Sequence, residues 1–220
     1  TNDSLVGVRD PQGFRPLCLG KTENGYVLSS ESCAFDAIKA EFIRHIDPGE
    51  MVIIDDSGVR STIYAEPEKI DKKLCVFEYI YFARGDSHID GQSVYQSRLN
   101  MGRELYNETK YDADIVMSIP DSGTTAALGY ARASGIPFAE GLVKNRYSGR
   151  TFIKPNQEER ELAVRMKLNA LPHVVGGKRI VLIDDSIVRG TTSGIIVKML
   201  KEAGAKEIYM CVSSPTIEYS

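Results

Sequence analysis

The sequence lacks several features that would place it in common protein classes. It has only four cysteines in 220 residues, and no two stand in a C-x-x-C spacing, which excludes a zinc knuckle or a thioredoxin motif. Its net charge of −3 provides no basic field to gather nucleic acid. No apolar run reaches the roughly 18 residues of a membrane span, and residues 1–10 lack the segments of a signal peptide. We therefore expect a cytoplasmic protein that binds neither nucleic acid nor membranes.

The length of the chain corresponds to about one and a half domains of roughly 150 residues each. Residues 5–8 have the composition of the middle of a strand, and the chain stops just after a strand expected at 207–212. We therefore expect a piece of a longer protein, with one larger domain and part of another.

Residues 1–65 predict an antiparallel meander with one short helix. Its expected elements are strands at 6–8, 26–28 and 51–54 and a helix over 31–38 that Ser30 caps. Residues 66–105 form a connector, which is helical over 94–106.

Residues 106–220 alternate strands with helices, which predicts βαβ units and a parallel sheet. The expected strands are 114–117, 137–139, 179–183 and 207–212, and the expected helices are 124–134 and 193–203. Ligands of such sheets bind beyond the carboxyl ends of the strands. The loops 120–123 and 184–192 are therefore the expected binding segments.

The most informative segment is 180–193. Asp184 and Asp185 end a buried strand, and a loop with Gly190 and four hydroxyl side chains then opens a helix. The free amides of a helix N-terminus suit a phosphate, whereas two carboxylates suit a vicinal diol or a divalent cation. Together they predict a ribose 5-phosphate site, and the alternative is an acidic turn before a capped helix. Neither a P-loop nor a G-x-G-x-x-G motif after a strand is present.

Segment 180–193 resembles the phosphoribosyl pyrophosphate (PRPP) motif of type I phosphoribosyltransferases. The wider chain resembles the glutamine PRPP amidotransferases at 9–17, 77–84, 141–147 and 164–169. The resemblance implies a type I phosphoribosyltransferase α/β parallel sheet, preceded by the C-terminal half of an α+β N-terminal-nucleophile (Ntn) glutaminase domain. The implied domains are 1–65 for that half, 66–105 for the connector, and 106–220 for a C-terminally incomplete phosphoribosyltransferase domain.

The resemblance also implies an activity, that of an amidophosphoribosyltransferase, which is a pentosyltransferase. In the first committed step of purine (IMP) biosynthesis, ammonia from glutamine displaces pyrophosphate from PRPP and yields 5-phosphoribosylamine. Mg²⁺, purine nucleotide inhibitors and a homo-oligomer are implied as well. The cysteine nucleophile of the glutaminase is absent from this chain, and Thr1, Cys18 and Cys33 do not match its position.

The implied PRPP site draws on three segments. Asp184 and Asp185 would contact the ribose hydroxyls and Mg²⁺, and Ser122 and Gly123 would lie at the pyrophosphate, with the Ser122 hydroxyl linked to the metal. The other implied PRPP contacts are Ser186, Ile187, Val188, Arg189, Gly190, Thr191, Thr192, Lys144, Arg146 and Tyr147. For Ser122 a helix N-cap is the other interpretation, and both roles are compatible.

Residues 144–167 carry seven basic and three acidic side chains with little periodicity. The resemblance implies a lid that closes over the polyphosphate, and the alternative is a solvated charged loop. Cys75 lies where some family members have a ligand of a [4Fe-4S] cluster, and its alternative is a buried core cysteine. One thiolate cannot hold such a cluster. Gly85 departs from the proline that the family usually has there.

Two other functions remain open at this point. A non-enzymatic PRPP-binding regulator would carry a DNA-binding helical head and a basic face, whereas this chain begins with a meander and has a net charge of −3. A phosphoribosyltransferase that acts on a free base would lack residues 1–65 and the connector.

Overall fold

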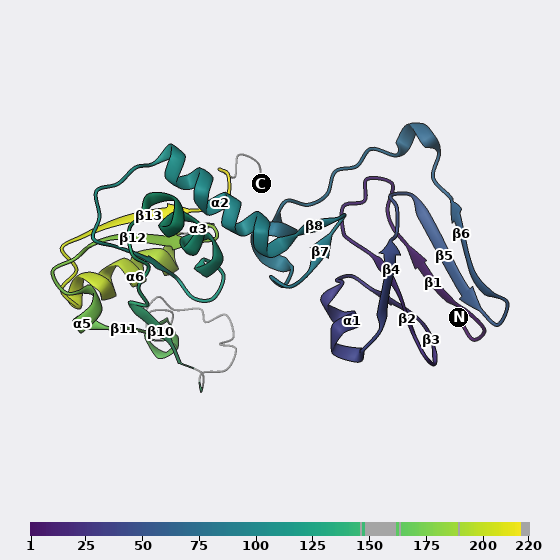
Figure 1. Ribbon diagram of the computed structural model, residues 1–220, viewed down its shortest axis with the longest axis horizontal. Helices are drawn as coiled ribbons and strands as arrows, with labels where there is room; N and C mark the ends of the chain where they lie inside the picture. Colours follow the sequence, from purple (N-terminus) through teal and green to yellow (C-terminus); the bar gives the residue numbers. More distant parts are fainter. Residues whose placement is uncertain (146, 148–161, 163, 189, 217–220) are drawn as a thin grey trace. The chain divides into compact units, whose positions relative to one another are not determined.

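The computed structural model describes residues 1–145, 147, 162, 164–188 and 190–216. The chain forms two compact units, residues 1–97 and 98–220 (Figure 1). Among the helices of the described residues, none has the length and apolar character needed to cross a membrane.

The first unit contains two three-stranded antiparallel sheets. One has the order β1-β5-β6, and its strands are Leu5–Val8, Glu50–Asp55 and Gly58–Ile63. The other has the order β3-β2-β4, and its strands are Gly25–Ser29, Cys18–Thr22 and Glu41–His45. A small core of Leu19, Ile46 and Val52 is buried in this unit. The predicted antiparallel strands are present, and the expected ones account for β1, β3 and β5. The prediction of a simple meander was wrong, because β1 pairs with β5 and β2 with β4 in two separate sheets.

The one α-helix of this part, α1 (Cys33–Ile38), begins two residues later than predicted. Ser32 stands at its N-cap, so the assignment of Ser30 as the cap was wrong. The Ser32 hydroxyl makes no capping bond and instead accepts the backbone N–H of His88 at 2.8 Å. The backbone of His88 therefore binds the hydroxyl group that would otherwise cap the helix.

The segment predicted as a connector contains η1 (Pro67–Lys69), the π-helix η2 (Glu78–Phe82) and the hairpin of β7 (His88–Ile89) and β8 (Gln92–Ser93). A buried ion pair attaches this hairpin to the segment that follows β1. Arg9, 2% exposed, donates to both carboxylate oxygens of Asp90 at 3.1 Å and to the carbonyl of Ile46 at 2.7 Å. Lys72 approaches the same carboxylate to 3.0 Å. Because each charge has a partner, the pair can be buried without an isolated charge.

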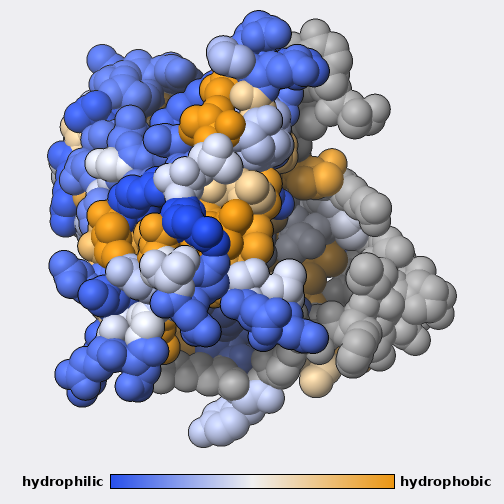
Figure 2. Space-filling model, turned by 90° about the vertical axis from the view of Figure 1, so that its right-hand side faces the viewer, coloured by the Kyte–Doolittle hydropathy of each residue, from blue (hydrophilic) through white to orange (hydrophobic). Residues whose placement is uncertain are grey.

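Large apolar side chains also reach the surface of the first unit. Figure 2 shows apolar side chains among polar ones on the face that it presents. The exposed residues of the two sheets include Leu5, Val8, Phe42, Ile43 and Ile63. Apolar exposure of this extent is characteristic of surfaces that contact other protein segments.

The second unit is built on a parallel sheet of order β13-β12-β9, which confirms the predicted topology. Its strands are Ile115–Ser118 for β9, Arg179–Asp184 for β12 and Glu207–Val212 for β13. Its longer helices are α2 (Val94–Glu108, which starts in the first unit), α3 (Thr124–Ser134) and α6 (Thr191–Glu202). The expected strand at 137–139 is reduced to one parallel bridge between Phe138 and Val116.

Both faces of this sheet are covered by buried side chains. Successive residues of a strand point to opposite faces, so each strand contributes to both cores. Met117 and Leu182 face a core that includes Ile196 and Leu200 of α6. Val181 lies on the other face, in a core with Ala127 and Tyr130 of α3. The first face is also covered by the short elements β10 (Leu142–Lys144), β11 (Leu168–Ala170) and α5 (Pro172–Val175). Burial on both faces explains the continuous apolar run at 180–183.

Two glycines allow α2 and α3 to pack closely. A Cβ on Gly102 would lie 1.8 Å from the carbonyl oxygen of Ala126, and a Cβ on Gly129 would lie 2.1 Å from that of Leu99. Both obstacles are backbone atoms, so a side-chain rotation cannot relieve them. The helix-to-helix distance therefore depends on the absence of both side chains.

We predict that Gly129→Ala lowers the free energy of unfolding by about 3 kcal/mol, the upper end of typical overpacking costs. Gly194→Ala is the matched control, because a Cβ there, also inside a helix, meets nothing within 4 Å. It should raise stability by about 0.5–1 kcal/mol through helix propensity. Urea unfolding of both variants measures the difference, and equal stabilities would contradict the packing argument.

Candidate functional site

The candidate site lies at the carboxyl ends of β9 and β12. The two strands pair in register up to Ser118 and Ile183, and the N–H of Ile119 donates to the carbonyl of Ile183 at 2.9 Å. The loop after β9 then turns back onto β12. A Cβ on Gly123 would lie 2.4 Å from the oxygen of Ile183 and 3.0 Å from the Cα of Asp184. The absence of a side chain on Gly123 therefore brings loop 120–123 against the first predicted acid.

The two predicted acids follow β12 and are held by local hydrogen bonds. The Asp185 N–H donates to Oδ1 of Asp184 at 2.9 Å, and the Ser186 hydroxyl donates to Oδ1 of Asp185 at 2.8 Å. The carbonyls of both acids accept N–H groups of Ser213 and Ser214, just beyond β13. Asp185 is 7% exposed and Asp184 is half-buried. The carboxylates are thus fixed in place at the end of the sheet.

The electrostatic environment of Asp184 is unfavourable for its charged form. The pKa of its carboxyl is raised to about 6, chiefly by burial; the Asp185 N–H opposes this rise, and the charge of the adjacent Asp185 adds to it. Within the described residues, no basic side chain forms an ion pair with either acid. Two adjacent carboxylates without a basic partner are a donor set suited to hydroxyl groups or a hard divalent cation.

The predicted phosphate loop leads directly into α6. Gly190 adopts φ +70° at the N-cap, a conformation that favours glycine, and the helix begins at Thr191, two residues earlier than expected. The backbone N–H groups of Thr191, Thr192 and Ser193 have no acceptor among the described residues, nor do the three hydroxyls have a partner there. Ile187 and Val188 are exposed, and Arg189 lies outside the described residues. The site thus offers free N–H donors at a helix N-terminus.

Ser122 is partly exposed in the loop before α3. Gly123 occupies the N-cap of that helix and no side chain caps it, so the N-cap interpretation of Ser122 was wrong. The adjacent peptide bond between Pro120 and Asp121 is cis.

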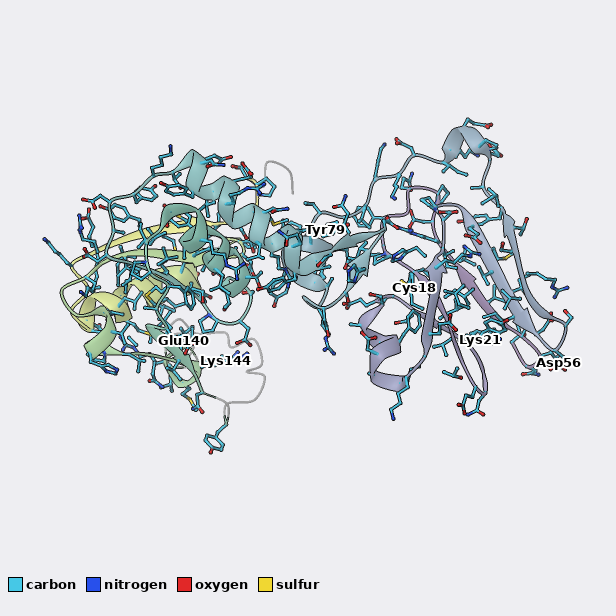
Figure 3. The ribbon with its side chains drawn as sticks, in the orientation of Figure 1. Cys18, Lys21, Asp56, Tyr79, Glu140 and Lys144 are labelled. Carbon is cyan, nitrogen blue, oxygen red and sulfur yellow. The ribbon has the colours of Figure 1, made fainter. Side chains whose placement is uncertain are left out.

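A pocket of about 660 Å³ adjoins this loop. Its lining residues come from β9, the two segments that follow it and β10: Ser118, Pro120, Asp121, Thr124, Phe138, Glu140, Leu142, Val143, Lys144 and Asn145. Figure 3 shows the labelled Glu140 and Lys144 close to each other beside β10. The predicted Lys144 therefore lies at the same pocket as the loop after β9. Asp184 and Asp185 are not part of its lining.

The segment predicted as a lid begins and ends in a two-stranded sheet that the sequence did not reveal. β10 pairs with β11, so that Lys144 lies opposite Leu168. Tyr147 is 99% exposed, whereas Arg146 and most of the segment lie outside the described residues. Arg165 forms an ion pair with Glu202 of α6 at 2.9 Å. This basic side chain of the predicted lid is therefore bound to α6.

The cysteines differ in their surroundings. Cys18, Cys33 and Cys211 are buried, and burial raises the pKa of the Cys18 and Cys211 thiols to about 11, so both remain protonated and unreactive. Cys75 is partly exposed and does not belong to a buried core. In the part of the chain that the structure describes, no group of three or more His, Cys, Asp or Glu side chains could hold a metal ion.

Asp184→Asn should make the metal-free protein more stable at neutral pH, because a raised carboxyl pKa in the folded state costs stability above that pKa. The folded wild type binds the extra proton between pH 4 and 6, so its stability falls over that range. We expect the free energy of unfolding of the variant, relative to wild type, to rise by about 1–2 kcal/mol from pH 4 to pH 7, after allowance for partial solvation. Chemical unfolding at both pH values measures this gain.

Asp114→Asn, at the opposite end of the sheet, serves as the control of opposite sign. Hydrogen bonds from Arg179 lower the pKa of Asp114 to about 2, so this carboxylate stabilises the fold above its unfolded pKa. The variant should be less stable than wild type at pH 7, with a deficit that shrinks as the pH falls from about 4 towards 2. The same pH trend in both variants would contradict these assignments.

Comparison with known proteins places this geometry in a family. A model described as "Phosphoribosyl transferase domain" matches residues 100–215. The chain is 55% identical over 98% of its length to the amidophosphoribosyltransferase of Archaeoglobus fulgidus, and 51% identical over its whole length to that of Bacillus subtilis. It covers 47% and 46% of these proteins, so it spans about half the length of the curated relatives it matches.

The structural comparison agrees. Glutamine PRPP amidotransferase from B. subtilis, complexed with ADP and GMP, superposes on the whole chain with a TM-score of 0.91, at 51% identity and with 48% of that protein covered. These matches confirm the resemblance inferred from the sequence, together with the predicted fold class of a type I phosphoribosyltransferase sheet preceded by half of an Ntn glutaminase domain. The chain belongs to the phosphoribosyltransferase family.

Proposed function

We propose that the protein containing this chain is an amidophosphoribosyltransferase, and that this chain carries its PRPP site. The observation that carries the proposal is the pair Asp184 and Asp185 beside the unpaired N–H groups at the start of α6. Carboxylates that accept ribose hydroxyls next to a phosphate-binding helix N-terminus match a phosphorylated ribose. Relatives with this name, about half identical over the chain, support the same activity.

Each part of the site has a proposed role in the displacement of pyrophosphate by ammonia. Asp184 and Asp185 orient the ribose, and residues 186–192 bind its 5-phosphate. Loop 120–123, with Ser122 and Gly123, receives the pyrophosphoryl group. Lys144, Arg146 and Tyr147 add contacts at the leaving group, where negative charge develops in the transition state.

Magnesium fits the residues present. Asp184 and Asp185 provide oxygen ligands without a basic partner among the described residues. Burial, with a smaller effect of the charge of Asp185, disfavours the charged form of Asp184, and a bound cation would offset that cost. We propose that these two acids and the Ser122 hydroxyl face the ion or its bound waters. When bound, Mg²⁺ would neutralise charge on the departing pyrophosphate.

The division into domains is part of the proposal. Residues 1–65 form the second half of a glutaminase domain, 66–105 the connector, and 106–220 the larger part of the phosphoribosyltransferase domain. The exposed apolar residues of the first unit support this division, because the other half of a domain would cover them. Glutamine hydrolysis would require the cysteine nucleophile of that other half.

Further properties follow from the proposed activity. The related B. subtilis structure holds ADP and GMP, which supports inhibition by purine nucleotides. We also propose a cytoplasmic homo-oligomer. Cys75 serves as an iron–sulfur ligand only if residues outside this chain complete the cluster, and no step of the reaction depends on it.

The proposal predicts that Asp184→Asn combined with Asp185→Asn abolishes ammonia-dependent formation of phosphoribosylamine. Ammonia is the appropriate donor, because it bypasses the glutaminase. The full-length protein should lose at least about 100-fold in rate, since the ribose loses both anionic acceptors. Circular dichroism and thermal unfolding confirm that the variant folds.

Calorimetric titration of the full-length protein with PRPP and Mg²⁺ separates the alternatives. Binding together with turnover supports the enzyme. Binding without turnover in the wild-type protein would instead indicate a PRPP-binding regulator, and the absence of binding would refute the site.

A further inference from the structure

The ammonium group of Lys144 is paired with an acid of the neighbouring loop. Its Nζ lies 2.5 Å from Oδ2 of Asp121, and both side chains line the pocket beside β9. The side chains are 52% and 77% exposed. Because exposed ion pairs contribute little to stability, maintenance of the fold is a weak explanation for this contact.

Asp121 is an unexpected charge in a loop with the features of an anion site. The loop precedes α3, an eleven-residue helix whose N-terminus attracts negative charge. The backbone N–H groups of Asp121 and Ser122 have no acceptor in the described part of the chain. A pyrophosphoryl group would be attracted by these donors and by Lys144, yet it would meet the Asp121 carboxylate.

We infer that Asp121 is the resting counter-ion of Lys144, which a pyrophosphoryl group displaces on binding. This inference rests on the proposed function and assigns Asp121 a positioning role at the same site. A pyrophosphoryl group carries several charged oxygens, so it competes successfully with one carboxylate for the ammonium group. The competition weakens its binding and returns Lys144 to Asp121 when pyrophosphate leaves.

The test is calorimetric titration of magnesium pyrophosphate into the full-length protein. Asp121→Asn should tighten binding about three-fold, within the range of an exposed ion pair. Asp112→Asn is the matched control, because it removes the same charge from an exposed acid that pairs with Arg179 at the opposite end of the sheet. This control should leave the dissociation constant unchanged.

Lys144→Gln distinguishes a counter-ion from simple repulsion. If Asp121 acts by occupying Lys144, Asp121→Asn should give no gain in the Lys144→Gln background. An equal gain in both backgrounds would identify direct repulsion of the ligand and overturn the inference, as would unchanged or weaker binding by the single Asp121→Asn variant.

The wild-type protein provides the reference for both proposals. If it binds neither PRPP nor magnesium pyrophosphate, the proposed function fails together with this inference. If it binds both but Asp121→Asn does not tighten pyrophosphate, only the counter-ion role is refuted.

Discussion

The parallel pairing of β9 with β12 is the constraint on which the site depends. Four register pairs, ending at Ser118 and Ile183, bring the carboxyl ends of the two strands to one edge of the sheet. Strands packed on both faces leave their loops little freedom to shift. Gly123 then allows the loop after β9 to contact the backbone of Asp184. Two loops separated by about 60 residues in the sequence become neighbours through this pairing.

The two ends of the sheet carry opposite electrostatic designs. At the amino end of β12, Arg179 bonds Asp112 and Asp114, so every charge has a partner. At the carboxyl end, Asp184 and Asp185 stand together, and burial disfavours the charged form of the first. One end of β12 therefore stabilises the sheet, whereas the other retains unfavourable charge that a ligand can relieve. Such a division is expected where binding residues are selected at a cost in stability.

The sequence was sufficient to predict the parallel sheet, because strands and helices alternate along residues 106–220. It was also sufficient to single out the segment around Asp184, where a buried strand, two acids and a glycine-containing helix start are adjacent. It was insufficient where tertiary contacts decide. The Ser32 hydroxyl binds the backbone of His88 and does not cap α1. The strands β10 and β11 have three residues each and are too short to give a periodic pattern in the sequence. Phe138 and Glu140 meet Lys144 at one pocket only through folding. The pair of Asp121 and Lys144 joins residues 23 apart, which no local pattern indicates.

The buried Arg9 has a consequence for the order of synthesis on the ribosome. Its carboxylate partner, Asp90, lies 81 residues further along the chain. At a translation rate of about 5–20 residues per second, this delay is roughly 4–16 s. During that interval the guanidinium group can reach the carbonyls of Gly13 and Arg15, and later that of Ile46, but it has no counter-charge from Asp90. The charge of Arg9 is therefore neutralised by Asp90 only after the hairpin of β7 and β8 has been synthesised.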